Sequence, residues 1–231
     1  MNKKLTEAQI TDQAKTLGIE VAALRAVIEV ECKGSGFNVD GTPVILFERH
    51  VMRQRLIANK RDIDLKLISV ERPDLCSKSV GGYGLYSAQH SRLNAAAQYH
   101  RDSALESASW GIGQVMGYHW KALGYPSLQA FINAMYRDEA SQLDAMCRFI
   151  KVNNLINALK NKDWEAFARG YNGPAYAKNS YDVKLGNAYK NGVNNANTHK
   201  LMEIQILDRN CGPFFYVAWA NCIYQSFERK T

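Results

Sequence analysis

The sequence predicts a mainly α-helical protein of the α+β class, with one small β-hairpin near the N-terminal third. Apolar residues recur at helical spacing along much of the chain, and one short β-branched and aromatic run comes early. An apolar fraction of 46% and a charged fraction of 22% are ordinary for a globular protein. A length of 231 residues suits one sizeable domain, with or without an appendage.

Two helices are predicted at the start of the chain. Thr6 with Gln9 is typical of a capping box, and Gly18 of a helix end. The second helix covers about residues 20–32. A turn signal at residues 40–41 then leads into a strand at 44–47, which completes the hairpin and ends next to Glu48. Further helices are expected at about 51–60, 91–107, 110–116, 127–136, 138–152, 163–171 and 181–191, after a long loop at 69–90.

Two glutamates near the end of the second helix face different ways. Leu24, Val27 and Ile28 share one helical face, and Glu31 continues that face. Glu29 instead lies in a row of charged residues. We therefore expect Glu31 to point inward, where burial and the negative end of the helix dipole raise the pKa of its carboxyl. Such a carboxyl suits a general acid, although it could also simply hydrogen-bond loop amides.

Charge and cysteine usage limit the partners and the compartment. The net charge of +7 favours acidic partners such as anionic envelope polymers, but no basic run or known signature indicates nucleic acid. Five cysteines without CxxC spacing argue against a disulfide framework or a zinc site. The start MNKKLTEAQITDQ lacks the apolar core of a signal peptide, and no window is apolar enough for a transmembrane segment. We expect a monomer that stays in a reducing cytoplasm until something else releases it.

Four motifs in order carry a family resemblance. ECKGSGF, SWGIGQ and RGYNG are similar to the E-S-x-x-x-F, G-x-x-Q and A-Y-N-x-G segments of goose-type lysozymes and lytic transglycosylases. More closely, ILFERH, YHRDSALESASWGIGQVMGYHWKALGY and YNGPAYAKNSYDVKL resemble the N-acetylmuramidase family of phage endolysins, over about residues 5–190. Cys32 stands where that family usually has serine, and a thiol is a fair isostere.

The resemblance implies a lysozyme-like domain over residues 1–193, followed by an extension of unknown role at 194–231. It also implies an endolysin-type hydrolase of bacterial peptidoglycan. The bond cleaved would be the β-1,4 linkage between N-acetylmuramic acid and N-acetylglucosamine, with Glu31 on the family's catalytic acid. The chain would then act in the periplasm, on the cell wall. Two alternatives are a lytic transglycosylase, which forms 1,6-anhydro products, and a non-catalytic peptidoglycan-binding protein of the same fold.

Hydrolysis also needs a second carboxylate. Glu48 is the first choice, because a hairpin end can place it across a cleft from the acid, but it could instead pair with Arg49 or His50. Asp102 and Glu106, which precede the G-x-x-Q segment, are further candidates and rank below Glu48. For sugar contacts we expect the polar groups of Gln114, Tyr171 and Asn172. Four aromatic residues could stack on sugar rings, although core packing is the more common role for each of them: Trp110, Tyr118, Trp120 and Tyr125.

Other chemistries fit the sequence poorly. A thiolate nucleophile is disfavoured, because Cys32 lies at a helix C-terminus, where the dipole raises the pKa of a thiol. The five histidines show no HxxxH or HExxH spacing, so we expect no metal and no cofactor. Residues 213–224 are apolar but too short to cross a bilayer. We favour packing on the domain, or no function, for this tail.

Overall fold

The computed structural model describes residues 3–32, 34–174 and 176–210. It is mainly helical with one small antiparallel sheet, so the predicted fold class is confirmed. The chain divides into two compact units, Met1–Tyr189 and Lys190–Thr231. The predicted boundary at residue 193 lies close to this division but stays a prediction, and tail residues 211–231 lie outside the described part.

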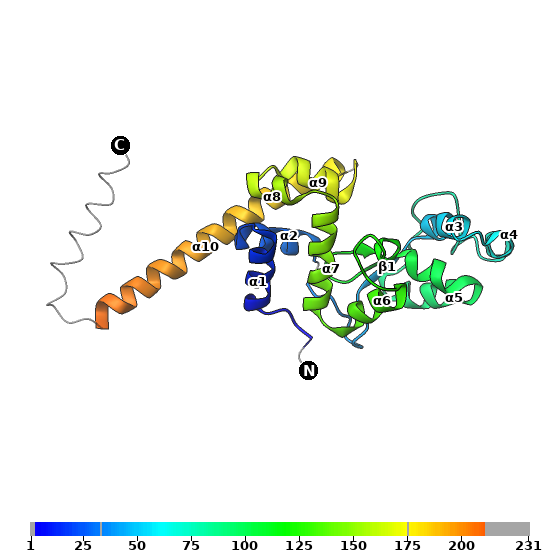
Figure 1. The fold of residues 1–231 in the computed structure, drawn as a ribbon, viewed down its shortest axis with the longest axis horizontal. Helices are drawn as coiled ribbons and strands as arrows, with labels where there is room; N and C mark the ends of the chain where they lie inside the picture. Colours follow the sequence, from blue (N-terminus) through cyan, green and yellow to red (C-terminus); the bar gives the residue numbers. More distant parts are fainter. Residues whose placement is uncertain (1–2, 33, 175, 211–231) are drawn as a thin grey trace. The chain divides into compact units, whose positions relative to one another are not determined.

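The helices follow one another along the chain, as the colour gradient shows (Figure 1). They are α1 (Glu7–Leu17), α2 (Val21–Glu31), α3 (Arg49–Ala58), α4 (Asp62–Glu71), α5 (Gln89–Glu106), α6 (Leu128–Arg137), α7 (Glu139–Val152), α8 (Ile156–Asn161), α9 (Trp164–Asn172) and α10 (Tyr181–Asn210). Three short 3-10 helices are η1 (Tyr86–Ala88), η2 (Gly117–His119) and η3 (Tyr176–Asn179). Helices α4 and α8 were not predicted from the sequence.

The first two helices form as their sequence indicates. The Thr6 hydroxyl accepts from the Gln9 amide, the Gln9 side chain accepts from the Thr6 amide, and Gly18 ends α1 in the left-handed region at φ 64°. Helix α2 buries Leu24 and Val27 on one face and leaves Glu29 exposed. The predicted capping box and the solvated position of Glu29 are therefore confirmed.

The sheet contains β1 (Ile45–Phe47), β2 (Ala108–Trp110) and β3 (Val115–Met116), antiparallel in that order. Ile45 pairs with Trp110, and Trp110 pairs with Val115. The helix predicted at 110–116 is therefore wrong, because this segment forms a strand, a turn and a second strand. The predicted hairpin before Glu48 is reduced to one bridge between Phe37 and Pro43, since β1 pairs with the distant β2 instead.

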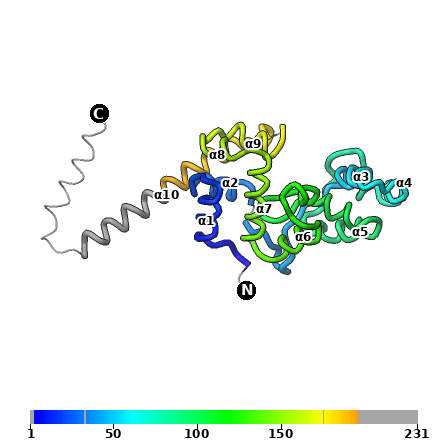
Figure 2. The backbone as a smooth tube through the Cα atoms, in the orientation of Figure 1, coloured from blue at the N-terminus to red at the C-terminus, as the bar shows by residue number. Residues whose placement is uncertain are grey.

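Helix α7 is central in the first unit. Figure 1 shows it running between the α1–α2 pair and the region of the sheet and α6, and it packs against α1, α6 and β3. Helices α3, α4 and α5 gather at one end of this unit, as the backbone tube shows (Figure 2). Large apolar side chains from these elements form one core, with Phe47, Trp110, Phe131 and Phe167 fully buried. Within the described residues, no helix has the length and apolar character that a membrane crossing needs.

Candidate active site

One cavity of about 730 Å³, here called the main cavity, collects side chains from distant parts of the chain. The end of α2, the strands β1 and β2, the turn at residues 111–114, the end of α9 and the start of α10 all contribute to its walls. Sequence-predicted site residues at this cavity are Glu31, Glu48, Gln114, Tyr171 and Asn172. The fold therefore brings the two first-choice carboxyls and all three predicted polar residues to one cavity.

Glu31 is the last residue of α2 and is partly buried at the wall of the main cavity. Burial raises the pKa of its carboxyl above the ordinary value, while a hydrogen bond from the Asn172 amide, 3.0 Å from Oε1, partly opposes that rise. The negative end of the α2 dipole also favours the protonated form. Glu31 is thus a carboxyl that keeps its proton to a higher pH than an exposed glutamate does.

Asn172 and Tyr171 end α9 beside this carboxyl. The Oδ1 atom of Asn172 is buried and has no hydrogen-bond partner among the described residues. The Tyr171 hydroxyl donates to the Gly113 carbonyl at 2.8 Å, and its ring stacks on Phe167. Because that bond joins α9 to the turn between β2 and β3, Tyr171 fixes two walls of the cavity relative to each other.

Gln114 lies in the tight turn that connects β2 to β3. Its backbone is left-handed, with φ 45°, and its side chain is held from both sides: Oε1 accepts from the Ser109 hydroxyl at 2.9 Å and Nε2 donates to the Gly111 carbonyl at 2.9 Å. These two hydrogen bonds hold the Gln114 side chain in a fixed position in the cavity wall. Its polar atoms already have partners within the turn, so its first role is to shape that wall.

Glu48 directly follows β1 and is the N-cap of α3. Its side chain is about one-fifth exposed, and its Oε2 lies 3.5 Å from Nε2 of His50. Burial raises the pKa of Glu48, while His50 opposes that rise. The pairing with His50 that the sequence left open therefore occurs, and Glu48 still lines the same cavity as Glu31.

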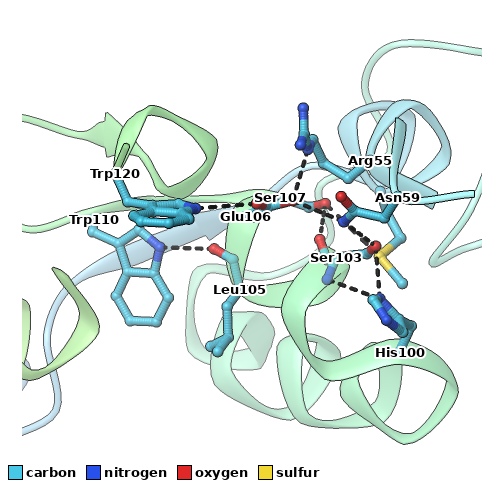
Figure 3. A network of polar contacts seen from close by, with 10 residues as sticks. Arg55, Asn59, His100, Ser103, Leu105, Glu106, Ser107, Trp110 and Trp120 are labelled. Atoms are coloured by element: carbon cyan, nitrogen blue, oxygen red, sulfur yellow. Dashed lines mark hydrogen bonds and ion pairs between the residues drawn. The ribbon is translucent and has the colours of Figure 1, made fainter. Parts of the chain in front are cut away.

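The two lower-ranked carboxylates lie elsewhere. Asp102 is exposed on α5 and pairs with Arg101. Glu106 is only 7% exposed, and Figure 3 shows it within a network of polar contacts. Its carboxylate accepts from Arg55 at 2.8 Å, Asn59 at 3.0 Å and Trp120 at 3.3 Å. Three donors bind this carboxylate and it does not line the main cavity, so its position fits a structural role that ties α3 to α5.

None of the four aromatic residues predicted as possible sugar contacts lines the main cavity. Trp110 is 1% exposed, and its indole donates to the Leu105 carbonyl at 3.2 Å, so it is a core residue with no free face for a ligand. Its burial follows from its position in the central strand β2. Tyr118 lies on η2 outside the cavity wall, under the Arg55 guanidinium. The alternative of core packing therefore holds for Trp110.

The sequence reasoning missed most of the aromatic wall. Four further tyrosines line the main cavity: Tyr83, Tyr86, Tyr176 and Tyr181. Tyr83 and Tyr86 follow the glycines at 81, 82 and 84 in a segment predicted only as a loop. A tyrosine close to glycines, which allow close backbone approach, is the sequence signal that could have found this pair.

Two buried side chains of α7 hold the loops that flank the main cavity. Glu139 accepts from the Gly36 amide at 2.9 Å, the Leu5 amide at 2.8 Å and the Ser35 hydroxyl at 3.0 Å. Burial raises the pKa of Glu139, but these hydrogen bonds outweigh it and hold the pKa below its usual value. The loop that follows Glu31 is thereby anchored to α7.

Gln142, one turn further along α7, reaches both sides of the cavity. Its Oε1 accepts from the Ile112 amide at 3.0 Å, and its Nε2 donates to the carbonyls of Gly36 at 3.2 Å and Met135 at 2.9 Å. A Cβ added at Gly36 would lie 1.9 Å from Gln142 Oε1, and one at Gly111 would lie 2.5 Å from its Cδ. Both glycines therefore leave the space that this side chain occupies.

Thiol and metal chemistry find little support in the geometry. Burial raises the pKa of the Cys32 thiol, which is the opposite of what a thiolate nucleophile requires. In the part of the chain that the structure describes, no three His, Cys, Asp or Glu side chains come together as a metal site. Whether the protein uses a metal or cofactor stays a prediction from the sequence.

A proton-holding carboxyl that shares an open cavity with a second carboxyl, tyrosines and amides is typical of enzymes that act on sugar polymers. A family model described as N-acetylmuramidase matches residues 20–192. The crystal structure of the Burkholderia AP3 phage endolysin is similar to this chain, with 44% identity, a TM-score of 0.78, and coverage of 85% of this chain and 73% of that one. None of the curated proteins compared with the chain matches it. The chain belongs to the N-acetylmuramidase family, which confirms the resemblance predicted from its motifs and its lysozyme-like fold.

Proposed function

We propose that this protein is an endolysin-type hydrolase of bacterial peptidoglycan. It cleaves the β-1,4 bond between N-acetylmuramic acid and N-acetylglucosamine, and Glu31 is the general acid. The observation that carries this proposal is the raised pKa of the partly buried Glu31 carboxyl at the wall of the main cavity. A carboxyl that keeps its proton to a higher pH than an exposed glutamate can transfer that proton to the departing glycosidic oxygen. Family membership and the similar phage endolysin support the same substrate.

Glu48 is the second carboxylate of the proposal. It lines the same cavity, whereas Asp102 and Glu106 do not. Burial raises the pKa of Glu48, and His50 beside it opposes that rise and so favours the ionised form, which is the form that activates water or stabilises positive charge on the sugar ring. The presence of this second carboxyl favours hydrolysis over the transglycosylase alternative, which uses the acid alone.

Two polar groups of α9 would position the substrate. The Nδ2 of Asn172 keeps the Glu31 carboxyl in place, and a small rotation of the amide would bring its unpaired Oδ1 to an N-acetyl amide of the substrate. The tyrosines of the cavity wall present flat faces for sugar rings. The net charge of +7 would draw the enzyme to the anionic cell wall, and added salt should weaken that attraction.

The test compares two glutamates of one helix. Glu31→Gln should abolish lysis of cell walls, with a loss of at least about a hundredfold that is usual for a general acid. Glu29→Gln, on the exposed face of α2, is the matched control and should stay close to wild type. Equal loss from both variants would contradict the assignment. The mass of the wild-type products separates hydrolysis, which adds one water, from anhydro-ring formation, which adds none.

A further inference from the structure

A second cavity of about 690 Å³, here called the side cavity, adjoins the main cavity. Tyr86 lines both cavities and so forms a wall between them. Successive side chains of β1 point to opposite faces of the strand. Leu46 therefore lines the main cavity, and its neighbour Ile45 lines the side cavity. Other residues at the side cavity include Asn38, Val39, Asp40, Leu85 and His90.

At the side cavity, the carboxylate of Asp40 uses one of its two oxygen atoms in hydrogen bonds within the protein. The Thr42 amide and hydroxyl donate to Oδ1 of Asp40 at 2.9 and 2.6 Å. These bonds lower the pKa of Asp40, so it is ionised near neutral pH. No hydrogen bond or ion pair to its Oδ2 occurs within the described residues. Oδ2 is therefore open to a cationic group of a ligand.

Apolar side chains lie beside this carboxylate. Leu85 is 74% exposed, and Val39 is fully exposed. The main cavity differs chiefly in its aromatic lining, because five tyrosines line it, whereas Tyr86 is the single tyrosine among the described residues at the side cavity. A glycan backbone carries hydroxyl and acetamido groups but no positive charge, so the side cavity matches a different part of peptidoglycan. The short peptides on its muramic acid residues carry alanine methyl groups and a diamino acid with an amino group.

We propose that the side cavity binds the peptide stem of a glycan strand whose sugars lie in the main cavity. Asp40 Oδ2 pairs with the amino group of the diamino acid, and Leu85 and Val39 contact its alanine methyl groups. Tyr86 makes the two binding surfaces continuous. This inference rests on the proposed function, because it takes peptidoglycan as the substrate.

The kinetic test uses glycan strands with and without their peptides. Wild type should show a higher kcat/KM on peptide-bearing strands than on strands stripped by an amidase. Asp40→Asn removes the charge but keeps the Oδ1 acceptor of the turn, and should lower kcat/KM on peptide-bearing strands about threefold to fivefold, as an exposed ion pair allows. Leu85→Ser should act in the same direction. On stripped strands both variants should equal wild type.

A binding test separates this inference from the proposed function. The probe is a synthetic stem peptide with a free side-chain amine, titrated into uniformly labelled Glu31→Gln protein and followed by NMR. Signals of residues 38–40 and 85–90 should shift, and acetylation of the amine or Asp40→Asn should weaken the binding. The matched control is Val70→Ser, on an 82% exposed residue of α4 outside both cavities, and it should change nothing.

Each outcome has one meaning. Equal wild-type kcat/KM on both substrates, or equal loss from Asp40→Asn on both, would overturn the peptide-stem site and leave the proposed hydrolase intact. Full activity of Glu31→Gln would overturn the proposed hydrolase, while the peptide titration would still report on the side cavity.

Discussion

Replacing Gln142 by methionine should lower the thermal stability of the protein strongly, because this side chain satisfies backbone groups on both sides of the main cavity. The substitution keeps the length of the side chain but removes its acceptor and its donors. Two backbone groups lose the partner that Gln142 gives them: the Ile112 amide and the Met135 carbonyl. The Gly36 carbonyl is less affected, because it also accepts from the Val44 amide at 2.8 Å.

The expected magnitude follows from these two groups. Leaving a buried polar group unsatisfied costs about 1–3 kcal/mol, so the free energy of unfolding should fall by roughly 2–6 kcal/mol. For a domain of this size, 1 kcal/mol corresponds to about 2–4 °C in Tm, so a loss near the middle of that range lowers Tm by roughly 8–16 °C. Gln142 is 1% exposed, and water therefore cannot replace the lost partners without a rearrangement.

Thermal unfolding by circular dichroism, with urea midpoints as a second measure, checks this expectation. Gln54→Met is the matched control, because Gln54 is exposed on α3 and the same exchange there should change stability by less than about 0.5 kcal/mol. If Gln142→Met melts within 2 °C of wild type, the hydrogen bonds of Gln142 do not hold the cavity loops. The glycines at positions 36 and 111 would then not be required by the position of the Gln142 side chain.

Three further predictions follow from the same geometry. Glu48→Gln should lower kcat by about a hundredfold or more with little change in KM, and near-wild-type turnover would move the second catalytic role away from this residue. Burial raises the pKa of Glu31, so the contribution of its carboxyl to stability is complete below its ordinary value of 4.5 and is lost as pH rises through the folded-state pKa. The Tm of Glu31→Gln relative to wild type should therefore increase between pH 4 and pH 7, and a constant difference would contradict the raised pKa. Gly36→Ala should destabilise the protein by steric conflict with Gln142, and Gln142→Ala should relieve part of that cost, with a coupling of about 0.5–3 kcal/mol in a double-mutant cycle. Strictly additive effects would rule out the conflict.

Helical spacing predicted the elements that have one apolar face. The exposed position of Glu29 and the partly buried position of Glu31 follow from i, i+3 and i+4 spacing alone. Helix α4 escaped prediction because it is apolar on two sides: Ile68 is buried, while Ile63 and Val70 are exposed. Such a helix has no clear periodicity. Helix α8 is only six residues long, which is too short for a periodic pattern.

The sheet could not be predicted from local sequence. Residues 110–116 form two strands and a turn because β2 pairs with β1, which comes much earlier in the chain. Pairing between distant segments leaves no local period, so the sequence left both a sugar contact and a core position open for Trp110. The position of Glu48 directly after a strand was predicted correctly, because the end of β1 is marked in the local sequence and does not depend on which strand pairs with β1.

The attachment of both cavity walls to Gln142 bears on how the substrate enters. A hinge motion that widened the main cavity at this point would have to break buried hydrogen bonds at Gly36 or Ile112, because both end on one side chain. The main cavity is thus preorganised where Gln142 ties its two walls together. Little ordering entropy is then lost when the strand binds, which suits an enzyme that meets its substrate as an immobile network rather than as a diffusing molecule.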